Sequence, residues 1–400
     1  MDDLLARLGE LPCGRRLLAA VAGRGGLHLV GGAVRDLLLR RPPRELDVLV
    51  EGDVAEAAAL LGGAAAVHER FGTATVESGG CRFDLAAARA EVYARPGALP
   101  DVRRAGVEQD LLRRDVTVNA IALDLRSGEL RAAEHALDDL RARRLRVLHD
   151  ASFVDDPTRL WRIARYAARL GFELEQHTAE LAAEAVAAGA LATVSGARIG
   201  NELRLALAEP DPLAALEHAV ALGLAPWLAP DRERVAAALE LLPPGEGRAD
   251  LVVLGASLAD SAGELDALLV DLGFDAGERT VLGACARAPQ LATQLLAADR
   301  PSALARVVRG LPVEALAVVG AHGAAAPVRR WLGELRRVSL SIGGDDLLVA
   351  GVPRGPQIGA RLAAVLDRRL DGELAAGREA ELAAALELPP AVPGRLPGGR

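Results

Sequence analysis

Two carboxylates stand two residues apart where an apolar segment begins, as Glu45 and Asp47 in ELDVLV. If this segment is a strand, both side chains point to the same face. Just upstream, LVGGAVRD places Gly31 and Gly32 between a short apolar run and a helical pattern. Glycines at that point let backbone N–H groups approach a phosphate at the start of a helix. A carboxylate pair beside a phosphate cradle is what nucleotidyl transfer assisted by two metal ions requires.

Each feature alone is more often a tight turn or a solvated strand face, because short motifs match by chance. Their order and closeness favour the functional interpretation. A third carboxylate, Asp84 in CRFDLAAAR, falls on another expected strand, with Phe83 and Leu85 facing the other way. Asp84 could complete a metal cluster or accept the proton of an attacking hydroxyl. As an isolated strand residue, it would be an ordinary surface or turn aspartate.

A further segment, EQDLLRRDVTVNAIAL, concentrates basic and acidic side chains. Arg113, Arg114 and Asp115 come immediately before an expected strand, and Asn119 follows four residues later. Arginine can bind a triphosphate, and an aspartate or asparagine can bind a ribose hydroxyl. The alternative is a helix end that carries compensating charges.

The segment DDPTRLWRIARYAARLGF predicts the start of a helix, with Asp155 or Asp156 as the N-cap and a proline in the first turn. Its arginines recur every three residues, at Arg159, Arg162 and Arg165, and therefore lie along one slowly drifting helical face. With Asp156 they form a donor–acceptor set that can read the hydrogen-bonding edge of a base. The alternative is a capped amphipathic helix with a solvated basic stripe.

The spacing of apolar residues predicts an α+β chain. Strands are expected at 27–30, 46–50, 73–78, 81–88 and 118–125, with helices near 33–40 and 53–62. From about residue 150 to 388, Ala, Leu, Arg and Glu recur at helical spacing, with breaks at Gly and Pro, which indicates an all-helical remainder. The final PPAVPGRLPGGR has the composition of a disordered segment.

Composition excludes several classes of protein. The sequence has no uncharged apolar run of roughly 18 residues, so we expect no membrane span, and MDDLLARL is not a secretory signal. Cys13, Cys81 and Cys285 show no pairing pattern, so we expect neither a disulfide framework nor a zinc site, and a cytoplasmic location. Every basic side chain is Arg, and the net charge is −8. That charge argues against a uniformly positive surface but permits a localised nucleic-acid track.

Taken together, five segments resemble the ordered motifs of the class II tRNA nucleotidyltransferase and poly(A) polymerase family, which includes the CCA-adding enzymes. They are LVGGAVRD, the Glu45–Asp47 pair, FDLAAAR, RRDVTVNA and DDPTRLWRIARYAARLGF. The resemblance covers about residues 28–173, with a weaker match at 343–362 (GGDDLLVAGVPRGPQIGARL). It implies a polymerase-β-like nucleotidyltransferase head (1–150), then a helical neck (151–210), body (211–330) and tail (331–388), with 389–400 disordered.

The resemblance also implies a role for each motif residue. Glu45 and Asp47 would hold Mg²⁺, and Asp84 would be the third catalytic carboxylate. In the tail, Arg354, Gly355 and Arg361 would bind the backbone of tRNA. Asp156 and Arg159 match the amino-acid template that pairs with the base of CTP or ATP. The full set of expected nucleotide-binding residues is Gly31, Gly32, Arg35, Arg114, Asp115, Asn119, Asp156, Arg159, Arg162 and Arg165.

Three positions depart from the family pattern: Glu45 and Asp155, where Asp and Glu respectively are usual, and Trp161, where an aliphatic residue is common. Glu is still an oxygen ligand suited to Mg²⁺. The implied activity is addition of C, C and A to tRNA, with no membrane and no obligate protein partner. CC addition alone, A addition alone, poly(A) synthesis and a non-catalytic RNA-binding role are the alternatives. We expect the flexible loop that separates them at residues 94–110.

Overall fold

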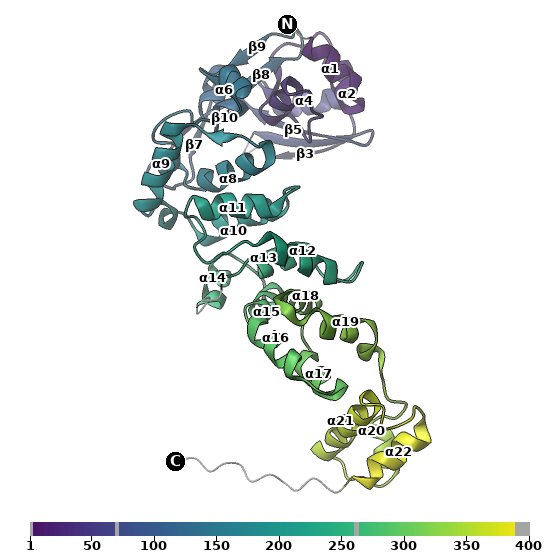
Figure 1. Ribbon diagram of the computed structural model, residues 1–400. Helices are drawn as coiled ribbons and strands as arrows, with labels where there is room; N and C mark the ends of the chain where they lie inside the picture. Colours follow the sequence, from purple (N-terminus) through teal and green to yellow (C-terminus); the bar gives the residue numbers. More distant parts are fainter. Residues whose placement is uncertain (1–2, 69–71, 260–263, 389–400) are drawn as a thin grey trace. The chain divides into compact units, whose positions relative to one another are not determined.

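The computed structural model describes residues 3–68, 72–259 and 264–388 (Figure 1). The chain forms two compact units, one made of residues 1–226 with 271–273 and the other of residues 227–270 with 274–400. The first unit is the mixed α/β part with its adjoining helices, and the second is helical. The finer division into head, neck, body and tail stays a prediction. The segment expected to be disordered, 389–400, lies outside the described residues.

A seven-stranded mixed sheet forms the core of the first unit, in the order β3-β4-β5-β2-β1-β8-β9. β1 is buried along its whole length. Its sequence, LHLV, is accordingly apolar apart from His28. Two smaller sheets pair β6 with β7 and β10 with β11. The strands are β1 (Leu27–Val30), β2 (Leu46–Val50), β3 (Ala64–His68), β4 (Thr73–Ser78), β5 (Cys81–Ala87), β6 (Arg89–Val92), β7 (Asp101–Arg104), β8 (Ile121–Asp124), β9 (Leu130–Ala132), β10 (Arg144–Leu145) and β11 (Glu173–Leu174).

The pairing of β2 with β5 places two of the expected catalytic carboxylates side by side. These strands run parallel, and Asp47 is the register partner of Asp84. Directly paired residues in neighbouring strands point to the same face, so both carboxylates share one side of the sheet. Glu45, expected on the strand with Asp47, is instead exposed in the turn just before β2 begins at Leu46. Two prolines precede it at 42–43, and a strand cannot readily extend back through them.

Helices of the first unit cover the sheet and continue beyond it (Figure 1). The strand expected at 118–125 is shorter than predicted, because Thr117–Asn119 form a 3₁₀ turn before β8. The helices are α1 (Leu4–Glu10), α2 (Pro12–Ala20), α3 (Gly32–Leu38), α4 (Val54–Leu61), α5 (Val107–Leu112), α6 (Ala136–Ala142), α7 (Ser152–Asp155), α8 (Thr158–Leu170), α9 (Gln176–Ala187), α10 (Gly196–Leu207) and α11 (Pro212–Ala221).

The start of α8 differs from the expectation in one detail. Asp155 is not its N-cap but the last residue of the short helix α7. Asp156 accepts hydrogen bonds from the backbone N–H and the hydroxyl of Thr158, so it satisfies a free donor in the first turn. Pro157 stands directly before the helix, where its missing N–H costs nothing.

The second unit consists of helices packed on their apolar faces. Its last three helices enclose a small core that includes Leu347, Val365 and Ala385. No helix in the described part of the chain is long and apolar enough to cross a membrane. The helices are α12 (Arg232–Leu241), α13 (Ala249–Ala256), α14 (Leu265–Asp271), α15 (Ala276–Cys285), α16 (Ala288–Ala297), α17 (Pro301–Val308), α18 (Val313–Val319), α19 (Ala325–Gly333), α20 (Gly344–Val349), α21 (Pro356–Leu370) and α22 (Arg378–Glu387).

The expectation of unpaired cysteines is wrong for two of the three. Cys13 in α2 and Cys81 at the start of β5 form a disulfide, with their Cα atoms 5.5 Å apart. Cys285 is free and buried, and burial raises the pKa of its thiol to about 12. The bridge joins residues 68 positions apart. Sequence spacing did not predict it, because only the packing of α2 beside β5 brings the two side chains together.

Candidate active site

The three catalytic candidates create a concentration of negative charge at the start of β2 and β5. Burial, together with the nearby charges of Glu45 and Asp84, raises the pKa of Asp47 to about 6, while the charge of Arg114 opposes the shift. Asp84 accepts a 2.6 Å hydrogen bond from the hydroxyl of Thr75 and pairs with Arg82 at 3.2 Å. Asp47 therefore lies among carboxylates with too little positive charge to balance them.

This charge distribution suits a bound cation. Mg²⁺ is commonly held by one or two carboxylates, with water and substrate phosphates completing the octahedron. Glu45 and Asp47 supply such a pair. Within the described ranges, no group of three or more His, Cys, Asp or Glu side chains is arranged to hold a metal ion. The residues thus fit a cation whose remaining ligands come from the substrate, and they do not form a complete protein cage.

A polar cavity of about 410 Å³ lies next to Asp47 and is lined by residues of every motif from the sequence. Gly31 has φ +66°, and a Cβ atom there would lie 2.7 Å from Arg114 Nη1, so only glycine fits this position. The cavity is lined by Gly31, Gly32, Asp47, Arg89, Glu91, Tyr93, Arg113, Arg114, Asp115, Asn119, Asp156, Thr158, Arg159, Arg162 and Tyr166.

Arg114 is placed to receive an anion in this cavity. Its Nη2 binds Asp110 at 3.0 Å, and its Nη1 contacts the Asn119 carbonyl at 3.4 Å. Its Nε atom is buried and finds no hydrogen-bond partner among the residues described. A buried donor without a partner is costly, so a phosphate oxygen at this point would satisfy it.

Arg35 lies outside that cavity, although we expected it to bind the triphosphate. It is buried, pairs with Asp36 at 2.8 Å and donates a 2.5 Å hydrogen bond to Asn119 Oδ1. It lines a second cavity, of about 440 Å³, which shares five residues with the first: Gly32, Asp47, Asn119, Arg162 and Tyr166. In this arrangement, Arg35 fixes the side chain of Asn119 at the boundary between the two cavities.

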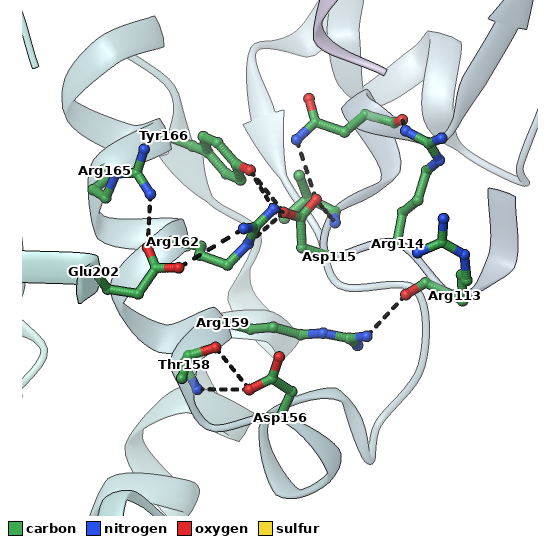
Figure 2. A network of polar contacts seen from close by, with 12 residues as sticks. Arg113, Arg114, Asp115, Asp156, Thr158, Arg159, Arg162, Arg165, Tyr166 and Glu202 are labelled. Atoms are coloured by element: carbon green, nitrogen blue, oxygen red, sulfur yellow. Dashed lines mark hydrogen bonds and ion pairs between the residues drawn. The ribbon is translucent and has the colours of Figure 1, made fainter. Parts of the chain in front are cut away.

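Asp115 is the centre of the polar network drawn in Figure 2. Its Oδ1 accepts from the Val116 N–H and Asn119 Nδ2, and its Oδ2 accepts from Arg162 and the Tyr166 hydroxyl. Burial alone would raise the pKa of Asp115. The charge of Arg162 and the hydrogen bonds from Tyr166, Arg162 and Asn119 outweigh burial and lower it well below the ordinary range.

The two template candidates lie at another part of the same cavity wall. Arg159 is buried and donates to the Ser152 hydroxyl and to the Arg113 carbonyl, both at 2.8 Å. Figure 2 shows the contact with Arg113. Asp156 is bound by Arg198 at 2.8 Å in addition to Thr158. These contacts hold the carboxylate and the guanidinium in fixed positions beside the cavity, which is what recognition of a base edge requires.

The other two arginines of α8 that we expected to bind the nucleotide, Arg162 and Arg165, differ in which cavity they line. Arg162 lines both. Arg165 lines only the second of them, where it pairs with Glu202 at 2.6 Å and Glu209 at 3.2 Å. Both guanidiniums are thus positioned by carboxylates of the fold, and Arg165 does not reach the cavity that holds Asp156 and Arg159.

Sequence reasoning missed several residues of this site, among them Glu91, Tyr93, Tyr166 and Arg198. Glu91, Tyr93 and Tyr166 line the first cavity. Arg198 does not line it but donates a hydrogen bond to Asp156. The chain contains only two tyrosines, and both face this cavity. Because only 2% of the residues are aromatic, the two tyrosines could have been singled out from the sequence as candidate site residues.

The tail candidates differ in their surroundings. Arg354 is exposed in the turn before α21, and Gly355 is the residue just before that helix, with φ +156°. Arg361 instead donates to the carbonyls of Ala385 and Leu386, at 2.5 and 3.5 Å. It thereby satisfies free carbonyl groups at the end of α22. Of the two arginines, only Arg354 presents its charge freely to solvent.

The sheet, its paired carboxylates and the Gly31–Gly32 turn define a nucleotidyltransferase head. Residues 27–146 match the poly A polymerase head domain, and residues 171–235 match the probable RNA and SrmB-binding site of polymerase A. These two matches identify a poly A polymerase head domain and a probable RNA-binding region within the chain. This confirms the resemblance and the expected fold class.

Three individual comparisons show which proteins this chain is similar to. It is 35% identical to an A-adding tRNA nucleotidyltransferase of Geobacter sulfurreducens, over 90% of this chain and 45% of that protein. It is 45% identical to a CC-adding tRNA nucleotidyltransferase of Deinococcus radiodurans, over 46% and 51%. The Thermotoga maritima CCA-adding enzyme complexed with tRNA superposes with a TM-score of 0.74 at 26% identity, over 96% and 97%. The chain spans about half the length of the curated relatives it matches.

Proposed function

We propose that this chain is a metal-dependent tRNA 3′-end nucleotidyltransferase that adds C, C and A from CTP and ATP without a nucleic-acid template. The observation that carries the proposal is the convergence of separate motifs on one cavity. Asp47 lies beside it, Arg114 offers it an unpaired donor, and Asp156 and Arg159 form part of its wall. The matched head domain and the names of the relatives support the same activity.

In this proposal, Glu45 and Asp47 hold Mg²⁺, which when bound neutralises charge on the reacting phosphates and lowers the pKa of the attacking 3′-hydroxyl. Asp84, the register partner of Asp47 in the sheet, would be the third catalytic carboxylate and would accept the hydroxyl proton. Arg114 binds the phosphates through its free Nε donor. Asn119, fixed by Arg35 and Asp115, turns its amide toward the ribose.

Base selection follows from the donor and acceptor pattern of Asp156 and Arg159. A carboxylate accepts from an exocyclic amino group, which both cytosine and adenine carry. A guanidinium donates to a ring nitrogen or a carbonyl. Uracil and guanine present the opposite pattern at the corresponding edge, so the pair favours CTP and ATP. We place this reaction in the cytoplasm, where tRNA maturation supplies the substrate.

Addition of A alone is a second candidate, because the A-adding relative aligns with 90% of this chain. The deciding experiment supplies three tRNAs, ending before CCA, after C and after CC, with Mg²⁺ and labelled CTP or ATP. The proposal predicts incorporation of C into the first two and of A into the third. Incorporation of A only, or of C only, would replace CCA addition by the corresponding partial activity. No incorporation into any of them would overturn the proposal.

A further inference from the structure

One of the two tyrosines of the chain, Tyr93, has no role in the site as derived so far. It follows β6 and lines the first cavity together with Asp156, Thr158 and Arg159. Its ring is half-buried. An aromatic ring in such a polar cavity offers a flat apolar surface, which phosphates and ribose do not need but a nucleobase does.

The hydroxyl of Tyr93 already has a hydrogen-bond partner within the protein. It donates to Glu91 Oε2 at 3.1 Å, while Glu91 Oε1 accepts from Arg89 and Arg113, both at 3.0 Å. Burial raises the pKa of Tyr93 to about 12, so the hydroxyl stays a donor at any working pH. With its polar end tied to Glu91, the ring is the part of Tyr93 that remains for a ligand.

The position of Tyr93 relative to the template residues is also fixed. Four residues later, the Gly97 N–H donates to the Val154 and Asp155 carbonyls, both at 3.2 Å. The Gly97 carbonyl accepts from Arg198 at 2.9 Å, and the same guanidinium binds Asp156 at 2.8 Å. Arg198 therefore couples the segment after Tyr93 to the carboxylate expected to read the base.

The other tyrosine does not offer a comparable surface. The guanidinium carbons of Arg162 and Arg169 lie 5.8 and 5.9 Å from the centre of the Tyr166 ring. Its hydroxyl is bound to Asp115 at 2.7 Å. Tyr166 also lines the cavity but is buried within the network of Figure 2, whereas Tyr93 is more exposed.

We propose that Tyr93 is a nucleobase-stacking residue, whose ring supports the base that Asp156 and Arg159 recognise at its edge. This inference rests on the proposed function, since it assigns a further contact to the same nucleotide. Every base has a π-face, so stacking adds affinity for cytosine and adenine alike without choosing between them. Affinity and selection are then divided between Tyr93 and the Asp156–Arg159 pair.

The test compares ligands with and without a base. Calorimetry with the full chain would measure Kd for CTP, ATP and inorganic tripolyphosphate, for wild type, Y93A, Y93L, Y93F and the neighbouring control V92A. Val92 is 50% exposed and does not line the cavity. Removal of the ring in Y93A or Y93L should weaken CTP and ATP by about 5- to 150-fold and leave tripolyphosphate unchanged. Y93F, which keeps the ring, and V92A should bind all three as wild type does.

Two results would overturn the inference. Equal weakening of all three ligands in Y93A and Y93L would mean that Tyr93 acts through Glu91 and Arg113 on phosphate binding. Unchanged binding of CTP and ATP would mean that the base stacks elsewhere. The proposed function is judged separately by incorporation into tRNA, so an active enzyme with an unaffected Y93A variant rejects only the stacking role.

Discussion

Arg162 Nη2 lies 2.5 Å from Asp115 Oδ2, and this contact joins helix α8 to the segment between α5 and β8. The residues proposed to read the base are on or just before α8, whereas those proposed to bind phosphate and metal lie in the part of the chain that forms the sheet. Asp115 also binds Tyr166 and Asn119. Asp115 accordingly fixes the position of helix α8, with its proposed base-reading residues, relative to the segment that carries Arg114 and Asn119.

Asp115→Ala should lower stability strongly. The substitution leaves Arg162 and the Tyr166 hydroxyl without their acceptor. We expect a loss of about 2–4 kcal/mol, less than for a fully enclosed pair, because Arg162 is 38% exposed. The measurement is the unfolding midpoint of the transition that includes this unit. Asp138→Ala is the matched control, since Asp138 and Arg141 form an exposed pair, and its effect should stay within about 0.5 kcal/mol.

The contribution of Asp115 should depend on pH in a defined direction. Its folded pKa is lowered from the ordinary 3.8, so its stabilisation is present above that value and lost as the pH falls through the lowered pKa. The gap in midpoint between wild type and Asp115→Ala should be full at pH 7 and shrink below about pH 4. A gap that stays constant down to pH 2 would contradict this account.

Arg159→Ala should relax nucleotide selection before it abolishes transfer. Without the guanidinium, the pocket loses its donor to a ring nitrogen or carbonyl, and Asp156 alone distinguishes bases less well. Relative kcat/KM for CTP over UTP and for ATP over GTP should each fall by at least about tenfold. Arg141→Ala, an exposed substitution away from the cavity, is the control. Unchanged discrimination among all four nucleotides would exclude Arg159 from the template.

Glu45→Asp should retain activity or increase it. The substitution restores the acid that is usual in the family, and Glu45 lies in an exposed turn that can adjust to a shorter side chain. A carboxylate oxygen remains available to Mg²⁺ in either residue. Transfer rates at saturating Mg²⁺ provide the measurement. A loss of more than about tenfold would show that the metal position depends on the longer side chain.

The two tail arginines should separate RNA binding from folding. Arg354→Ala should weaken tRNA binding and reduce the slope of log Kd against log salt by about 1, with nucleotide binding unchanged. Arg361→Ala should lower the stability of the α21–α22 pair, because it removes a donor to carbonyls of α22.

Deletion of 331–400 should weaken tRNA binding far more than nucleotide binding. If Arg354→Ala binds tRNA as wild type does at every salt concentration, the RNA contacts lie elsewhere.

Local signals in the sequence predicted the strands around Asp47 and Asp84, the glycine turn and helix α8, because each depends on short-range periodicity or capping. That these segments converge on one site was predicted from the resemblance to the family's ordered motifs. The disulfide between Cys13 and Cys81 could not be predicted, since it depends on how α2 packs near β5. The same limit hid Arg198, whose contacts with Gly97 and Asp156 exist only after α10 packs beside α8.

The central claim is that Asp47 is a metal-binding carboxylate of a nucleotidyl transfer site, and Asp47→Ala tests it most directly. The measurement follows incorporation of labelled CTP and ATP into tRNA that lacks CCA, together with the Kd for that tRNA. Loss of the carboxylate should reduce incorporation by about 10²–10³-fold or more, because charge stabilisation of the transition state disappears. Binding of tRNA should stay within about threefold of wild type, since the proposed contacts with tRNA are to its phosphates and lie away from Asp47. Incorporation near the wild-type rate would contradict the account.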